Sequence, residues 1–132
     1  MEYLYNEVIK RFPEMSSHLD DEDKDLPYLI MGYLADWIKK FKSSEITPEL
    51  TNRIVYFAQW CEEQPQGETA EDDLYTVLVV AFYEALFTSE STRFLIPKLM
   101  SKQEILKNKE YFKIWVGEDN YNLALEKYKT GV

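Results

Sequence analysis

Apolar residues recur at helical spacing from the first residues of the chain onward. Leu4, Val8 and Phe12 lie four residues apart and predict a first helix. This helix should end near Phe12, because the ring of Pro13 disfavours helical conformation at the residue before it. A second helix is expected to begin at Pro27, whose missing N–H is tolerated in a first turn. Its apolar face comprises Leu29, Ile30, Tyr33, Leu34, Trp37, Ile38 and Phe41.

Two capping signals predict the next helices. Thr47-Pro48 supplies a capping hydroxyl and a first-turn proline, so a third helix is expected from here to the turn at Pro65–Gly67. Thr69 and the acids after it predict the start of a fourth helix, spanning about residues 69–88. Its body, residues 74–87, is apolar on nearly every side and longer than a usual strand of about 5–6 residues. We therefore expect a central helix that the other helices cover.

The predicted helices are shorter in the last third of the chain. Ser101 and Glu104 match a capping box and predict the start of a short helix. Gly117 suits the end of the following helical segment, and Asp119 can cap the last helix. The connections are short, and no internal repeat is present. We expect residues 1–132 to form a single compact all-α domain of about five to seven helices.

The composition supports one folded domain. The chain has 132 residues, of which 45% are hydrophobic, and this is enough to build a core without disulfides or metals. No apolar run approaches the roughly 20 residues of a membrane-spanning helix, and the first residues do not have the pattern of a signal peptide. The single cysteine, Cys61, fits a reducing compartment. We therefore expect a cytoplasmic, bacterial-type protein that has no membrane partner.

Negative charge is concentrated in one part of the chain. The 24 acidic residues outnumber the 15 basic ones, and the resulting net charge of −9 argues against nucleic acid as a partner. Residues 1–90 hold 19 acids and 7 bases, whereas residues 91–132 hold 5 acids and 8 bases. The densest run has six acids in twelve residues and no base: Glu62, Glu63, Glu68, Glu71, Asp72 and Asp73. Such a run either caps helices and aids solubility, or it attracts a basic protein.

Three aromatic residues lie beside this acidic run. Most of the twenty aromatic residues fall on the apolar stripes and are predicted to belong to the core. Tyr56 and Trp60, however, lie four residues apart beside the stripe of the third helix, and Tyr75 lies in the first turn of the fourth. Large rings next to charged residues are typical of protein-binding surfaces. Core packing is the alternative interpretation.

Candidate catalytic and metal-binding residues are few. His18 is the only histidine, and with Glu14 and the acidic run Asp20–Asp25 it could form at most a weak metal site. The acidic run also lacks the glycine and the final acid that a calcium-binding loop requires. Cys61 lies on an apolar stripe next to Glu62 and is expected to be buried rather than nucleophilic. We expect no enzymatic activity, no cofactor and no bound metal, and the alternative is a metal-dependent hydrolase built on Glu14, His18 and the Asp20–Asp25 region.

Three segments of the chain resemble a known group of proteins. These are Phe12–Glu14, the run Leu26–Trp37, and the pattern of Tyr111, Phe112 and Trp115. Together they resemble small helical bacterial proteins, some of which are similar to immunity proteins encoded beside secreted or contact-delivered toxins. The resemblance implies a binding role in the producing cell and supplies no catalytic motif.

These observations predict a non-enzymatic immunity protein that binds and neutralises a cognate toxin. The expected partner is the toxin's catalytic domain, which should be basic, with a nuclease as one candidate. A homo-oligomeric adaptor or regulatory module, in the simplest case a homodimer that uses its aromatic faces, is the alternative. The predicted binding surface comprises Tyr56, Trp60, Glu62, Glu63, Glu68, Glu71, Asp72, Asp73 and Tyr75.

Overall fold

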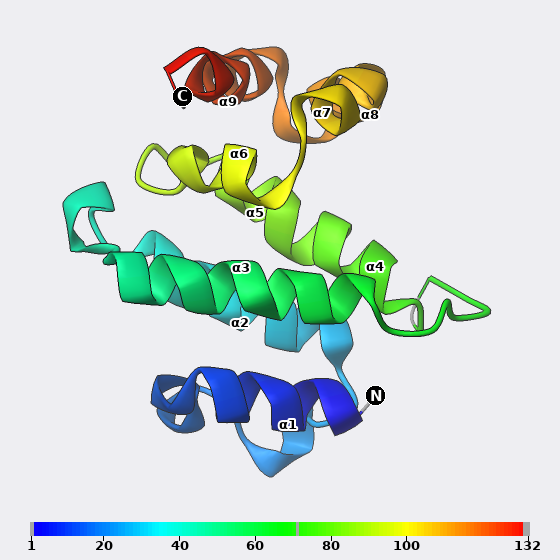
Figure 1. Ribbon diagram of the computed structural model, residues 1–132. Coiled ribbons are helices and arrows are strands. Elements are labelled where there is room, and N and C mark those ends of the chain that lie inside the picture. Colours follow the sequence, from blue (N-terminus) through cyan, green and yellow to red (C-terminus); the bar gives the residue numbers. More distant parts are fainter. Residues whose placement is uncertain (1, 71, 131–132) are drawn as a thin grey trace.

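The structure is a computed structural model that describes residues 2–70 and 72–130 (Figure 1). This part of the chain contains helices and turns but no strand, so the predicted all-α fold is confirmed. The first three long helices are α1 (Glu2–Arg11), α2 (Pro27–Lys39) and α3 (Pro48–Glu62). Thr47 caps α3 as predicted, because its hydroxyl accepts a hydrogen bond from the Leu50 N–H at 3.1 Å.

The central helix is continuous but not uniform. It consists of α4 (Leu74–Val77), a π-helical turn (Leu78–Tyr83) and α5 (Glu84–Phe87), with helical backbone angles at both junctions. The helix begins at Leu74 rather than near residue 69. Asp73, not Thr69, is the N-cap, since its carboxylate accepts a hydrogen bond from the Thr76 N–H.

The second half of the chain adds shorter helices. They are α6 (Ile96–Leu99), α7 (Lys102–Lys107), α8 (Lys109–Val116) and α9 (Glu118–Thr130). The predicted capping box at Ser101 and Glu104 begins α7. With the central helix counted once, the described residues form eight helices, of which α6 is a single turn. Short 3₁₀ turns lie at Pro13–Ser17, Asp21–Asp23, Ser43–Glu45 and Arg93–Leu95.

The central helix lies between two groups of helices. In Figure 1, α1 lies at one end of the molecule, α2 and α3 cross above it, and α7, α8 and α9 lie at the opposite end. The π-helical turn contacts α2, α4 contacts α3, and α5 contacts both α8 and α9. Its buried side chains include Val77, Leu78, Phe82, Tyr83, Leu86 and Phe87. The prediction that this segment is the centre of the fold is therefore confirmed.

Aromatic rings connect the helices on the α1–α3 side of the central helix. The ring of Phe57 in α3 packs edge-on against those of Phe12 and Phe82, with centroids 5.6 and 6.3 Å away. Arg53 closes the surface over this cluster, with its guanidinium 5.5 Å from the Phe12 ring centroid. It also pairs with Glu14 through two hydrogen bonds of 2.9 Å each. None of the described helices combines the length and apolar character that crossing a membrane would require.

Candidate partner-binding site

The loop between α3 and α4 is organised by two of its own carboxylates. Asp72 accepts hydrogen bonds from the N–H and the hydroxyl of Thr69, at 2.7 and 2.8 Å. Asp73 accepts hydrogen bonds from the Gly67 N–H at 3.0 Å and from the Thr76 hydroxyl at 2.6 Å. Hydrogen bonding from Thr69 lowers the pKa of Asp72, and hydrogen bonding from Thr76 and Gly67 lowers the pKa of Asp73. Both carboxylates are therefore firmly ionised at neutral pH.

Gly67 allows this loop to close on itself. A Cβ atom at this position would lie 2.2 Å from the backbone oxygen of Asp72, which is too close for any side chain. The loop is also attached to α2, because the Tyr28 hydroxyl donates a hydrogen bond of 2.9 Å to the Ala70 carbonyl. The predicted turn at Pro65–Gly67 is thus followed by hydrogen-bonded residues outside any helix, and the next helix begins at Leu74.

Several carboxylates gather in this region of the chain. We call Glu62, Glu63, Glu68, Asp72 and Asp73 the acidic corner. In the part of the chain that the structure describes, none of these five forms an ion pair with a lysine or arginine. Glu71, the sixth predicted acid, lies outside the described residues. Asp72 and Asp73 also stabilise local structure through the hydrogen bonds that they accept.

Trp60 is half-buried, so it packs against the core and is also partly exposed at the surface. Its ring stacks on Phe57 with centroids 6.3 Å apart, so it packs against the core. Its outer edge meets Tyr3 of α1, with centroids 6.0 Å apart. The pKa of Tyr3 is raised by burial and then by negative charges that include Asp72 and Asp73, so Tyr3 connects Trp60 to the acidic corner. Tyr56, one turn before Trp60 on α3, is 58% exposed.

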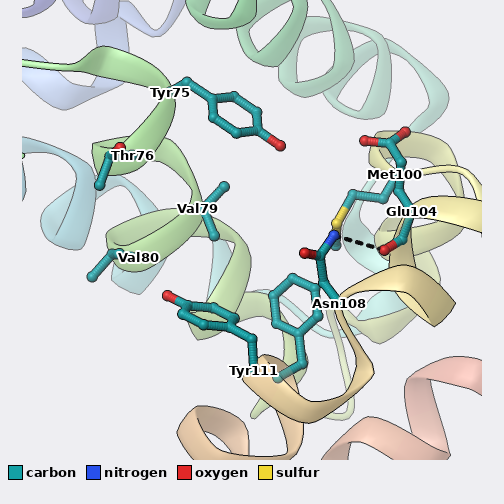
Figure 2. A pocket seen from close by; sticks show the side chains of 9 residues that line it. Tyr75, Thr76, Val79, Val80, Met100, Glu104, Asn108 and Tyr111 are labelled. Atoms are coloured by element: carbon teal, nitrogen blue, oxygen red, sulfur yellow. Dashed lines mark hydrogen bonds between the residues drawn. The ribbon is translucent and has the colours of Figure 1, made fainter. Parts of the chain in front are cut away.

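Tyr75 lies at the mouth of a pocket that the sequence did not predict. The pocket, which we call the tyrosine pocket, has a volume of about 230 Å³ and lies between the central helix and the segment that contains α7 and α8 (Figure 2). Its lining comprises Tyr75, Thr76, Val79, Val80, Met100, Glu104, Asn108, Tyr111 and Phe112. Of these residues, only Tyr75 belonged to the predicted surface.

One glutamate lines this pocket, and a second contacts a tyrosine of the lining. The carboxylate of Glu104 lines it and is held in place by the Ser101 N–H at 3.2 Å. Glu84 accepts a hydrogen bond of 2.5 Å from the hydroxyl of Tyr111, whose ring lines the pocket. Burial raises the pKa of Glu84, and the hydrogen bond from Tyr111 opposes that rise. Among the described residues, neither glutamate forms an ion pair.

Tyr75 joins the acidic corner to the tyrosine pocket. Burial raises its pKa, and the negative charges of Glu62 and Glu104 raise it further. Glu62 accepts a hydrogen bond of 3.3 Å from the buried Tyr83 hydroxyl. Burial raises the pKa of Glu62, and the charge of Glu104 adds to the increase. In Figure 2 the Tyr75 hydroxyl points toward the Glu104 side of the pocket.

An exposed apolar face of α8 adjoins the pocket. Ile114 and Trp115 are 75% and 65% exposed, which is unusual for large apolar side chains in neighbouring positions. The Trp115 ring lies 6.3 Å from that of Tyr111, so this face continues from the pocket lining. The sequence pattern identified this segment as a helix but did not single out Ile114 or Trp115 as binding residues.

The candidate catalytic residues do not assemble into a site. Glu14 is engaged by Arg53, which lowers its pKa mainly through the hydrogen bonds between them, and His18 is exposed. Within residues 2–70 and 72–130, no group of three or more histidine, cysteine, aspartate or glutamate side chains could hold a metal ion. Cys61 is buried as predicted, and burial raises the pKa of its thiol.

Comparisons with protein-family models, with curated proteins and with solved structures find no match to this chain. The site is therefore defined by its own geometry. Among the described residues, it combines carboxylates that form no ion pair, partly exposed aromatic rings and a small pocket.

Proposed function

We propose that this chain is a non-enzymatic immunity protein that binds the basic catalytic domain of a cognate toxin and blocks its active site. One observation carries the proposal: the carboxylates of the acidic corner and of the tyrosine pocket have no basic partner among the described residues, although exposed aromatic rings lie beside them. A complementary positive surface would supply the missing charges.

Electrostatics explains how such a surface would work. Unpaired carboxylates in one region create a local negative potential that steers a positively charged protein into contact and raises its association rate. Aromatic rings at the same surface then provide the buried contact area that slows dissociation. The ionised Asp72 and Asp73 keep this potential at neutral and mildly acidic pH, because their pKa values are lowered.

The expectation that the partner is a toxin comes from the resemblance of Leu26–Trp37 and the two flanking segments to toxin-immunity proteins. An immunity protein acts in the cytoplasm of the bacterium that makes the toxin. A nuclease is a suitable target, because its active site is positively charged to bind phosphates and would accept a carboxylate surface in their place. We accordingly expect an immunity gene directly downstream of a large toxin-bearing reading frame.

The test is to measure binding to the toxin domain encoded by that neighbouring gene. Glu63→Lys with Glu68→Lys reverses two exposed charges of the acidic corner that make no hydrogen bond in the described structure. Stopped-flow association at low salt should become at least about tenfold slower for this variant. Glu22→Lys with Glu90→Lys is the matched control, since both side chains are exposed and the net charge changes equally. Equal slowing of both variants would show that the acidic corner is not the contact.

A homodimeric adaptor is the second candidate, and the exposed Ile114 and Trp115 favour it. A dimer built on this apolar face would persist in high salt, because it does not depend on charge. Light scattering of the purified chain at low and high salt separates the candidates. A monomer under both conditions supports the immunity role, whereas a dimer that salt does not dissociate supports the adaptor.

A further inference from the structure

We propose that the tyrosine pocket binds a single arginine side chain of the partner protein. This inference rests on the proposed function, which requires a basic partner, and it identifies the group that enters the pocket. The argument follows from the size of the pocket, its lining and the charges around it.

The size of the pocket suits one side chain. Its volume of about 230 Å³ is below the roughly 300–1,000 Å³ of pockets that hold drug-sized molecules. The pocket is also partly open to solvent, and the half-exposed ring of Tyr75 is part of its lining (Figure 2). A side chain that projects from a docked protein could therefore enter it without any rearrangement of the main chain.

The lining suits a long side chain with an apolar stem and a flat head. Val79, Val80 and Met100 offer apolar surface for the methylene groups of the stem. The partly exposed rings of Tyr75 and Tyr111 offer aromatic surface on which a planar cation can stack. Phe112 itself is fixed, because it stacks on Phe87 with centroids 4.8 Å apart.

The charge around the pocket is negative. Glu104 and Tyr75 both line the pocket, Glu84 accepts a hydrogen bond from the lining residue Tyr111, and Glu62 accepts one from Tyr83 of the central helix. Among the described residues, none of these three glutamates forms an ion pair. A cation that entered here would meet carboxylates that nothing else in the described structure neutralises.

These features favour arginine over lysine. A guanidinium is planar, stacks on aromatic rings and donates hydrogen bonds in a fork that matches a carboxylate, whereas an ammonium is a compact and strongly hydrated point charge. The exposed Ile114 and Trp115 beside Tyr111 extend the contact, and we expect them to pack against apolar residues that flank the arginine in the partner.

The test uses a short peptide and does not need the toxin. Acetyl-Leu-Arg-Leu-amide is titrated into the ¹⁵N-labelled full chain, in parallel with the same peptide carrying citrulline, which has the shape of arginine without its charge. The arginine peptide should shift the amide signals of Tyr75, Val79, Glu104, Tyr111 and Phe112, and the citrulline peptide should bind at least about tenfold more weakly. The corresponding lysine peptide should also bind more weakly than the arginine peptide.

A variant and its control complete the test. Glu104→Gln removes the charge but retains the capping box, because glutamine also serves at this position. We expect it to weaken binding of the arginine peptide about five- to tenfold, while Glu110→Gln on the exposed surface of α8 changes binding less than twofold. Equal binding of the arginine and citrulline peptides, or no shifts at the pocket residues, would overturn the assignment. Equal binding of the lysine peptide would overturn the choice of arginine.

The outcome is independent of the toxin-binding experiment. If arginine fails here but Glu63→Lys with Glu68→Lys still slows toxin association, the assignment of the pocket is wrong and the immunity role stands. If the peptide binds as expected but the chain does not capture the neighbouring toxin domain, the pocket assignment is supported and the toxin proposal fails.

Discussion

Glu14 and Glu84 show two ways of holding a carboxylate. Glu14 lies on the α1–α3 side of the central helix, and Glu84 belongs to the central helix itself and contacts α8. On the α1–α3 side, Glu14 accepts two hydrogen bonds from Arg53, which lower the pKa of the Glu14 carboxyl group. On the α7–α8 side, Glu84 is held by the Tyr111 hydroxyl, and burial raises its pKa. Arginine neutralises the carboxylate that it holds, whereas tyrosine leaves the negative charge available to another molecule.

The packing of the aromatic rings also differs between the two sides, being closed on the α1–α3 side and open on the α7–α8 side. Phe12, Phe57 and Phe82 interlock on the α1–α3 side, and the Arg53 side chain covers Phe12. On the other side the rings of Tyr75 and Tyr111 stand apart around an open pocket. The aromatic packing is therefore closed on the α1–α3 side and open around the tyrosine pocket.

The largest expected loss of stability follows from removing a buried ring on the α1–α3 side. Phe57→Ala should lower the free energy of unfolding by about 3–5 kcal/mol, because it removes a fully buried ring that joins three helices. Val80→Ala in the lining of the open pocket should lower it by less than about 1 kcal/mol. Urea unfolding followed by circular dichroism measures both values. Similar losses for the two variants would contradict the proposed difference between the sides.

Replacing the arginine of the closed side should have an intermediate effect. Arg53→Met should lower the free energy of unfolding at pH 7 by about 1–2 kcal/mol, because it breaks a two-point pairing with Glu14 on a partly exposed surface. The pKa of Glu14 is lowered by folding, so its contribution is complete above the unfolded value of 4.5 and is lost as pH falls through the lower folded value.

The pH dependence of this variant is therefore diagnostic. The difference between the wild type and Arg53→Met should shrink steadily as urea unfolding is repeated at pH values below 4.5. A difference that stays constant over this range would mean that Arg53 acts through its packing on Phe12 and its other contacts rather than through Glu14.

On the open side, Tyr111→Phe should lower the free energy of unfolding by about 1 kcal/mol, since it removes the hydroxyl that donates to Glu84. The same change should raise the pKa of Glu84 further, because the hydrogen bond from Tyr111 is the interaction that opposes the effect of burial. NMR titration of the Glu84 side-chain carbon measures this increase. Tyr56→Phe, on the exposed surface of α3, is the matched control and should alter neither quantity.

The smallest expected effect on the free energy of unfolding is a gain rather than a loss. Burial raises the pKa of Glu62 in the folded state, so the ionised carboxylate is unfavourable above that pKa and the penalty disappears as pH falls below the unfolded value. Glu62→Gln should therefore leave stability unchanged or increase it by up to about 0.5 kcal/mol at pH 7. Glu14→Gln should instead decrease stability, and urea unfolding of both variants at pH 7 compares them directly.

Local patterns in the sequence predicted most of the helices. The stripe of Leu4, Val8 and Phe12 identified α1, and the caps at Thr47 and Ser101 fixed the beginnings of α3 and α7. The start of the central helix was harder to predict from the sequence, because Thr69 and Asp73 are both good capping residues. Only the folded loop, in which Thr69 donates to Asp72, decides between them.

The candidate site could be predicted only in part. The acidic corner is a run along the chain and is visible in the sequence, whereas the tyrosine pocket joins residues as far apart as Tyr75 and Phe112. No local pattern reports such a contact. A signal was present for the exposed face of α8, because burial of Phe112 and Val116 on one stripe leaves Ile114 and Trp115 on the other faces of the helix.

The π-helical turn at Leu78–Tyr83 lets the central helix hold an extra residue without changing the direction in which Phe87 points. A π turn accommodates one more residue than an ordinary helical turn. Loss of a single residue such as Ala81 would let the segment relax into a regular α-helix, with the positions after it on nearly the same faces as before. If the segment instead kept every residue and became a regular α-helix, those positions would rotate about the helix axis by about 100°, given 3.6 residues per turn. Phe87 would then face away from Phe112, so the contact between the central helix and α8 depends on the π turn.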